Sequence, residues 1–129
     1  MQRANFEIVL RHTNTKRDIA TRSFDFALNI VRLCRYLDGH SHVGRLLLQQ
    51  LLRSGTSIGA NVEEGRAGQS KADFINKNAI ALKEARETRY WLRLLSESGV
   101  VDQVNLDPLI KEAGEISRIL GAIVSRAKH

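Results

Sequence analysis

The sequence predicts an all-α protein, folded as an antiparallel up-down-up-down bundle of four helices. Leucine, alanine, arginine and glutamate are abundant, and Pro108 is the only proline in 129 residues, a composition that favours helix over sheet. Apolar residues recur at three- and four-residue steps in four separate segments, which is the spacing of one helix face. Short connections between long amphipathic helices are typical of such bundles.

The first predicted helix covers residues 16–38. Phe26 and Ile30 lie on its apolar stripe, and Gly39 is a natural stop because glycine readily adopts the left-handed conformation of a helix C-cap. Residues 1–15 show no helical period and are assigned to an N-terminal arm. The remaining residues, 16–129, have the size of a single domain.

The second predicted helix covers residues 42–64, with Ser41 as its N-cap. Its apolar stripe includes Leu51 and Ile58 and does not break at Gly55. The regular period indicates that the helix continues through Gly55 and Gly59. The later glycines of this segment are expected in the turn that follows the helix.

The third and fourth predicted helices cover residues 70–98 and 106–127. Ser70 is followed three residues later by an acidic residue, which is a capping-box pattern. Gly99 is expected to end the third helix, and Pro108 suits the first turn of the fourth. The apolar faces of the first and third helices are wider than one internal seam requires, so we expect a homo-oligomer.

Composition and charge bound the partners and the location. The net charge is +6 and the isoelectric point is near 10, which permits a polyanionic partner such as RNA or DNA, or serves solubility alone. No run of eighteen apolar residues occurs, so no transmembrane helix and no membrane partner are expected. The N-terminus lacks the apolar region of a signal peptide, and a cytoplasmic location is expected.

The glycine-rich stretch at 53–70 does not fit a phosphate-binding loop. Such a loop needs four residues between its two glycines and then Lys with Ser or Thr, whereas Gly55 and Gly59 have three residues between them. The two glycines lie one helical turn apart, and each costs about 1 kcal/mol in a helix interior. We therefore interpret Gly55 and Gly59 as positions of close helix packing.

A row of polar residues lies beside these glycines on the second helix. Their spacing of four, four and three residues puts them on one face, which is consistent with a ligand site or with a buried hydrogen-bond network to the third helix. We favour the network, because buried polar groups fix helix register when they are fully satisfied. Its expected members are Arg53, Ser57, Asn61 and Glu64, with Glu84 and Glu87 of the third helix.

No constellation in the sequence supports catalysis, a metal or a cofactor. Di-iron bundles use Glu-x-x-His on inward faces, and that pattern does not occur. The four histidines lie outside the predicted helix cores, which leaves no context for histidine-dependent nucleophilic catalysis. The protein is therefore expected not to be an enzyme.

Basic residues recur along the predicted helices without an accompanying aromatic stacking motif. Binding of nucleic acid would therefore be directed to the phosphate backbone and tolerant of sequence. Interleaved acids also allow part of this surface to be a solvated helix face. The candidate contacts are Arg17, Arg22, Lys71, Lys77, Lys83, Arg86, Arg89, Arg93, Arg118 and Arg126.

Residues 51–95 carry a long motif. Its first part is Arg53, Ser54, Ser57, Ile58, Asn61, Glu64, Ser70, Asp73, Phe74 and Ile75, and its second is Glu84, Ala85, Glu87, Thr88, Tyr90, Trp91 and Leu92. This pattern resembles the four-helix bundle family named for proteins encoded in intervening sequences of 23S ribosomal RNA genes, once called S23 ribosomal proteins. The similarity spans about residues 16–128, and the motif departs from the family at Asn78 and in its glycine-rich turn.

The resemblance implies a ring-shaped homopentamer with no known catalytic residues. It also includes, more distantly, the accessory variability protein of diversity-generating retroelements, which is basic and binds nucleic acid and a reverse transcriptase. Two hypotheses follow. The protein binds RNA or DNA through its basic surface, or it is a scaffold that docks a partner protein, such as a reverse transcriptase or a ribosomal component, and its charge serves solubility.

Overall fold

The computed structural model describes residues 18–37, 41–101 and 104–129. The predicted N-terminal arm, residues 1–15, lies outside them. Within the described residues the chain forms helices and no strand, which confirms the all-α class. The four helices are α2 (Ile19–Tyr36), α3 (His42–Ala67), α4 (Lys71–Ser98) and α5 (Asp107–Lys128).

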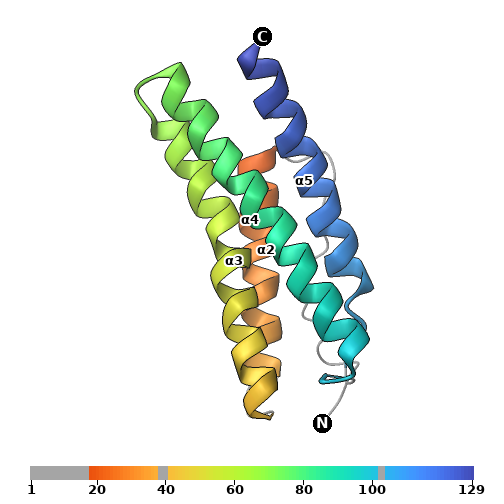
Figure 1. Cartoon of the computed structure of the whole chain (residues 1–129). Helices are drawn as coiled ribbons and strands as arrows, with labels where there is room; N and C mark the ends of the chain where they lie inside the picture. The colour runs from red at the N-terminus through yellow and green to blue at the C-terminus, as the bar shows by residue number, and fades with distance from the viewer. Residues whose placement is uncertain (1–17, 38–40, 102–103) are drawn as a thin grey trace.

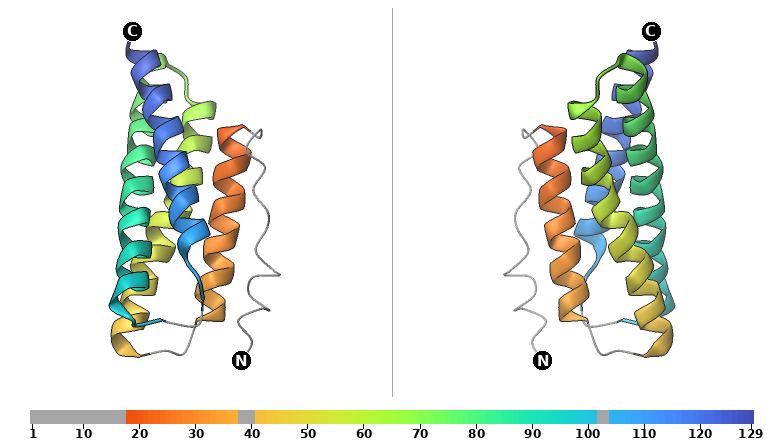
Figure 2. Two further views of the ribbon diagram at one scale, coloured as in Figure 1. Left: turned by 90° about the vertical axis from the view of Figure 1, so that its right-hand side faces the viewer. Right: turned by 90° about the vertical axis from the view of Figure 1, so that its left-hand side faces the viewer.

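The helices lie side by side as neighbours in chain order (Figure 1). α3 packs against α2 and α4, and α5 packs against α4 and α2, as the side views of Figure 2 also show. α3 and α4 run in opposite directions, because Ser54 contacts Thr88 near their middles whereas Glu64 contacts Lys77 near the connection. Every helix therefore turns one face to a shared interior.

Local side-chain chemistry sets the helix ends. Asp18, Ser41 and Ser70 each accept a hydrogen bond from the backbone amide three residues later, at 2.8, 3.1 and 3.0 Å, which satisfies an amide that has no partner inside the helix. The amide of Thr21 is the main cause of a lowered pKa at Asp18. Gly99 ends α4 with φ +75°. The caps expected at Ser41, Ser70 and Gly99 are present.

α3 extends three residues beyond the predicted end at 64, to Ala67. Gly65 is therefore inside the helix rather than in the turn where it was expected. A Cβ atom at Gly65 would lie 3.1 Å from Nδ2 of Asn78 and 3.2 Å from Cβ of Lys77. The absence of a side chain at this glycine lets α4 approach α3 closely, and packing overrides the local preference for a turn.

The apolar stripes of all four helices meet in one core. Its fully buried side chains include Phe26, Ile30, Leu33, Leu51, Ile58, Leu92, Leu95, Ile116 and Leu120. Burial of each such side chain stabilises the fold by about 1.5–3 kcal/mol. Among the helices that the structure describes, none is long and apolar enough to cross a membrane.

Candidate nucleic-acid interface

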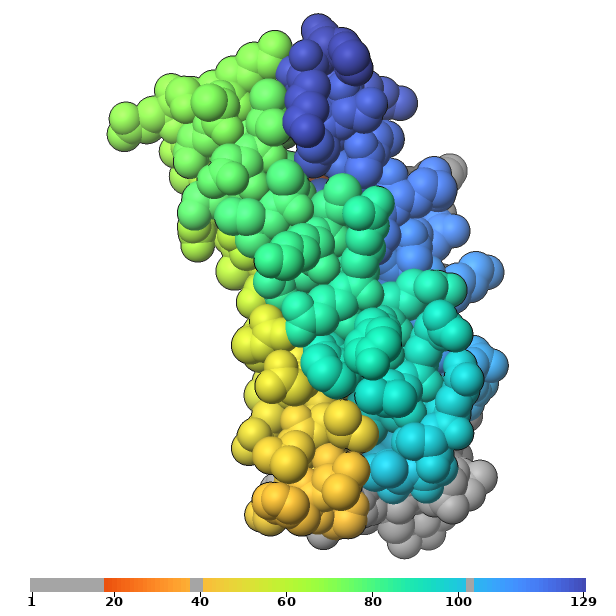
Figure 3. All heavy atoms as spheres, viewed as in Figure 1, coloured from red at the N-terminus to blue at the C-terminus, as the bar shows by residue number. Residues whose placement is uncertain are grey.

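α4 and α5 form one broad face of the molecule (Figure 3). Arg86, Arg89 and Arg93 are exposed on α4, and their spacing of three and four residues places them along one side of the helix. Lys83 is exposed one turn before Arg86. Lys83, Arg86, Arg89 and Arg93 therefore place four exposed cations along α4.

Arg89 joins the basic row of α4 to α5. A Cβ atom at Gly114 would lie 3.6 Å from Nε of Arg89, so the guanidinium group packs against the α5 backbone where there is no side chain. Lys111 and Arg118 are exposed on α5, three residues before and four residues after Gly114. We call Lys83, Arg86, Arg89, Lys111 and Arg118 the basic face.

Most of the basic face carries uncompensated charge. Lys83, Arg86, Arg89 and Lys111 form no ion pair with any residue that the structure describes. Arg118 pairs with Glu115 at 3.5 Å on the surface, where such pairs contribute about 0–1 kcal/mol. Exposed cations without acidic partners raise the local positive potential.

The other predicted contacts lie outside the basic face. Arg93 pairs with Glu97 at 3.6 Å, and Lys77 pairs with Glu64 at 2.7 Å, a hydrogen bond that raises the pKa of Lys77. Lys71 is exposed at the start of α4 and Arg126 in the last turn of α5. Arg17 lies outside the described residues.

Arg22 does not belong to the surface, which corrects its assignment as a nucleic-acid contact. Its side chain is 3% exposed and donates hydrogen bonds to both carboxylate oxygens of Glu112 at 2.7 and 2.8 Å. A further oxygen, from Glu115, lies 3.4 Å away. The hydrogen bonds to Glu112 are the main cause of the raised pKa of Arg22, and the bond to Glu115 adds to it. Arg22 links α2 to α5 and offers nothing to a phosphate.

The polar row of α3 forms only part of the expected network. Arg53 reaches α4, where it contacts Glu84 at 3.2 Å and also Glu87, but its side chain is 47% exposed. Ser57 and Asn61 instead hydrogen-bond to backbone oxygens of their own helix. The row therefore links α3 to α4 on the surface at Arg53 and at Glu64, which pairs with Lys77, and it is not the buried network that was expected.

The buried polar link between α3 and α4 lies one residue away. The hydroxyl of Thr88 donates to the hydroxyl of Ser54 at 2.9 Å, and Ser54 is fully buried. Within α4, the indole Nε1 of Trp91 donates a hydrogen bond to Glu87 at 2.9 Å. The sequence gives no local signal for this bond, because Ser54 and Thr88 are 34 residues apart.

Gly55 and Gly59 of α3 both face α2. A Cβ atom at Gly55 would lie 3.0 Å from Cγ2 of Ile30, which is closer than side chains normally pack. At Gly59 the nearest atoms belong to Ser23 and lie 3.5 Å away, an ordinary van der Waals distance. Of these two glycines, only Gly55 therefore requires the absence of a side chain.

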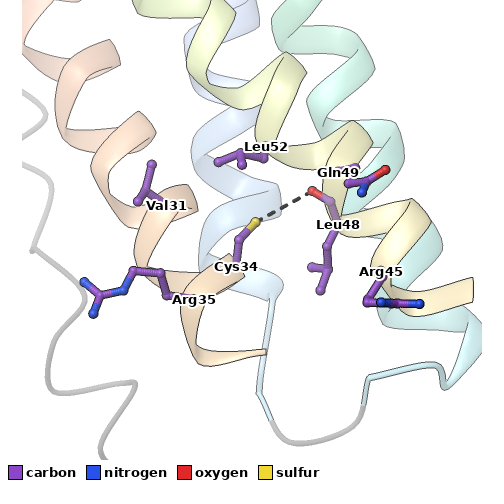
Figure 4. Close-up of a pocket in the computed structure, with 7 residues that line it drawn as sticks. All are labelled: Val31, Cys34, Arg35, Arg45, Leu48, Gln49 and Leu52. Carbon is purple, nitrogen blue, oxygen red and sulfur yellow. Dashed lines mark hydrogen bonds between the residues drawn. The ribbon is translucent and has the colours of Figure 1, made fainter. Parts of the chain in front are cut away.

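An apolar groove lies between α2 and α3 (Figure 4). It has a volume of about 290 Å³, and its lining residues are Val31, Cys34, Arg35, Arg45, Leu48, Gln49 and Leu52. The thiol of Cys34 contacts the carbonyl oxygen of Leu48 at 3.8 Å, and burial raises its pKa to about 12. At neutral pH the thiol of Cys34 is therefore protonated, and Cys34 lines the groove rather than acting as a nucleophile.

The described residues offer no metal centre. No group of three or more His, Cys, Asp or Glu side chains within this part of the chain is arranged to hold an ion. Its carboxylates are instead used in pairs with cations, as at Glu84, Glu87 and Glu112.

The fold and this face define a class: an all-α helical protein with a basic surface on two adjacent helices. The chain belongs to the 23S rRNA-intervening sequence protein family, whose model matches residues 15–122. The description of this family names no reaction. The resemblance found in the sequence is thereby confirmed.

A solved structure supports the same assignment. It is a protein of unknown function from the S23 ribosomal protein family of Bacteroides thetaiotaomicron, 41% identical to this chain. The match covers 83% of this chain and 98% of the Bacteroides chain, with a TM-score of 0.74. No curated protein matches the chain.

Proposed function

We propose that this chain is a non-enzymatic protein that binds the phosphate backbone of RNA or DNA through its basic face. The four helices form an antiparallel up-down-up-down bundle, and copies of the bundle assemble as a homo-oligomeric ring. A nucleic-acid partner fits the cytoplasmic location expected from the sequence. The contacts between α2 and α3, and those between α3 and α4, join early residues of one helix to late residues of the other. This pattern supports the antiparallel order.

The lack of acidic partners at Lys83, Arg86, Arg89 and Lys111 carries the proposal. These side chains are exposed on adjacent helices, whereas Glu112 is bonded to the buried Arg22. Phosphates would supply the counter-charge that the described residues do not. Contacts of this kind release counterions and bind without reading sequence.

A salt series of filter-binding measurements tests the proposal. The double variant Arg86→Gln/Arg89→Gln should bind a short RNA of mixed sequence less tightly, and its plot of log K against log salt should be shallower by about 2. Arg66→Gln is the control, because Arg66 is exposed but pairs with Glu63. An unchanged slope in the double variant contradicts the assignment of the basic face, and no binding by the parent at low salt contradicts the function.

The alternative function is a scaffold that docks a partner protein. Exposed apolar side chains favour it, because Tyr90 and Leu94 lie one helical turn apart on α4 at 58% and 37% exposed, and contiguous apolar surface marks protein contacts. A stoichiometric protein partner that remains bound after nuclease treatment, with no affinity of the pure protein for RNA, supports this alternative over the basic face.

A further inference from the structure

An aromatic side chain lies among the cations of α4. Tyr90 is 58% exposed and follows Lys83 and Arg86 by seven and four residues, which places the three side chains on one exposed side of the helix. Arg86 precedes Tyr90 by about 6 Å along the helix axis. The sequence showed no aromatic stacking motif, because a single tyrosine in a helix has no spacing signature. The structure thus adds an exposed ring to the cations of α4.

Trp91 supports the ring of Tyr90. The two ring centroids are 5.1 Å apart and the ring planes meet at 74°, which is an edge-to-face contact. Trp91 is half-buried and packs against the core, and its indole Nε1 is bonded to Glu87. Because the ring of Tyr90 rests on a side chain that is itself fixed, less conformational freedom is lost when a ligand packs on it. The ring is therefore positioned before a ligand arrives.

The surface around Tyr90 suits an uncharged planar group. Tyr90 and Leu94 line a shallow hollow of about 150 Å³ together with Arg93 and Glu97. Arg93 and Glu97 pair with each other at 3.6 Å, so their charges cancel and the hollow offers little to a phosphate. The cations one and two turns earlier on α4 form no ion pair with any residue that the structure describes. The α4 surface therefore has separate places for an aromatic base and for phosphates.

A single strand of nucleic acid presents both groups to such a surface, whereas a duplex does not. In a duplex the bases are stacked on one another inside the helix, and a protein that does not read sequence meets mainly phosphates. In a single strand each unpaired base has a free π-face that stacks on aromatic side chains, while the backbone follows a basic surface. The ring and the cations of α4 match the single strand.

We propose that this face of α4 binds single-stranded RNA or DNA, with one unpaired base stacked on Tyr90 and the adjoining phosphates on Lys83 and Arg86. The inference rests on the proposed function and names the form of nucleic acid that the basic face takes. Stacking on Tyr90 adds affinity without reading sequence, because every base has a π-face. In the alternative function the same side chain would contact a protein.

Filter binding to a short oligonucleotide of mixed sequence, as a single strand and as its duplex, tests this assignment. Tyr90→Leu should weaken binding of the single strand by about 5- to 150-fold, the range for one stacked base, and should leave the affinity for the duplex unchanged. The slope of log K against log salt should also stay the same, since no charge is removed. Tyr90→Phe should bind both forms like the parent, because it keeps an aromatic ring.

Phe24→Leu is the matched control, because Phe24 is an aromatic side chain of α2 that is 64% exposed and lies outside the basic face. It should leave both affinities unchanged. Trp91 is the only tryptophan of the chain, and its contact with Tyr90 makes its fluorescence a second readout. Saturating single strand should quench Trp91 in the parent and in Tyr90→Phe, and should quench it less in Tyr90→Leu. Circular dichroism establishes that each variant is folded.

The outcomes separate this inference from the proposed function. A parent that binds no nucleic acid at low salt overturns both. A parent that binds only the duplex, or a single-strand affinity that Tyr90→Leu leaves unchanged, overturns the inference alone, as do equal losses on strand and duplex, because Tyr90 would then act through the fold. A protein partner displaced by Tyr90→Leu at unchanged single-strand affinity assigns Tyr90 to that partner and also overturns it. A loss confined to the single strand supports it, and the larger loss, on RNA or on DNA, identifies the polymer.

Discussion

At the scale of single residues, Arg22 uses a full positive charge to hold two helices together. Its guanidinium group is buried and donates hydrogen bonds to both oxygens of the Glu112 carboxylate, a side chain that is itself only 12% exposed. Removing two charges from water is costly, and the cost is offset only when the geometry and the hydrogen bonds are good. The pair therefore fixes how α2 and α5 meet.

Arg22→Met should destabilise the protein by about 3 kcal/mol, because it leaves Glu112 without its partner in a largely buried position. The double variant Arg22→Met/Glu112→Leu should recover most of the loss, since an apolar pair of similar volume replaces the ions. Urea unfolding of both variants measures this. Arg66→Met, at an exposed pair, should stay within about 0.5 kcal/mol of the parent. Equal stability of Arg22→Met and the parent would show that the pair is not structural.

The sequence could not distinguish Arg22 from the surface arginines. Its partner is 90 residues away along the chain, and local spacing carries no information about such a contact. Arg86 and Arg89 were candidates on the same grounds as Arg22, and the structure is what shows them to be exposed. Charge type predicts which residues can bind phosphate, but only the packing of α2 on α5 decides which of them are available.

At the scale of elements, α3 is a long helix whose glycines pack against different neighbouring helices. Gly55 lies against Ile30 of α2, and Gly65 lies against Lys77 and Asn78 of α4. A glycine in a helix interior costs about 1 kcal/mol relative to alanine. Close approach of a neighbouring helix explains that cost at both positions, whereas Gly59 has room for a side chain.

Alanine substitutions at Gly55 and Gly59 should change the stability of the protein in opposite directions. Gly59→Ala should stabilise the protein by up to about 1 kcal/mol, because the new methyl group fits and the unfolded chain loses freedom. Gly55→Ala should destabilise it by about 1–3 kcal/mol, because Ile30 is fully buried and its branched side chain is stiff. Thermal unfolding of the two variants gives the signs. Changes of the same sign would contradict the packing described for α3.

Helix starts and stops were predictable where a nearby side chain or glycine determines them. Ser41, Ser70 and Gly99 act within one helical turn of their own position, so the sequence contains the whole signal. The end of α3 was not predictable, because glycine near residue 65 indicates a turn by propensity. The contact with α4 that extends the helix to Ala67 exists only after folding.

At the scale of the whole molecule, the net charge of +6 is unevenly placed. Several acids are engaged between helices, as in the pairs of Glu84 and Glu87 with Arg53. Lys83, Arg86, Arg89 and Lys111 on α4 and α5 form no ion pair with a described residue, and the same holds for Arg35 and Arg45 beside the groove between α2 and α3. In the proposed function, the basic face is the surface that meets a polyanion.

Chemical footprinting of arginines tests the central claim most directly. Phenylglyoxal modifies exposed guanidinium groups, and mass spectrometry reports the rate at each arginine with and without a short RNA of mixed sequence. The account predicts that RNA slows modification of Arg86 and Arg89 and leaves Arg66 unchanged. Equal rates at Arg86 and Arg89 with saturating RNA, or protection confined to other arginines, would contradict binding through the basic face.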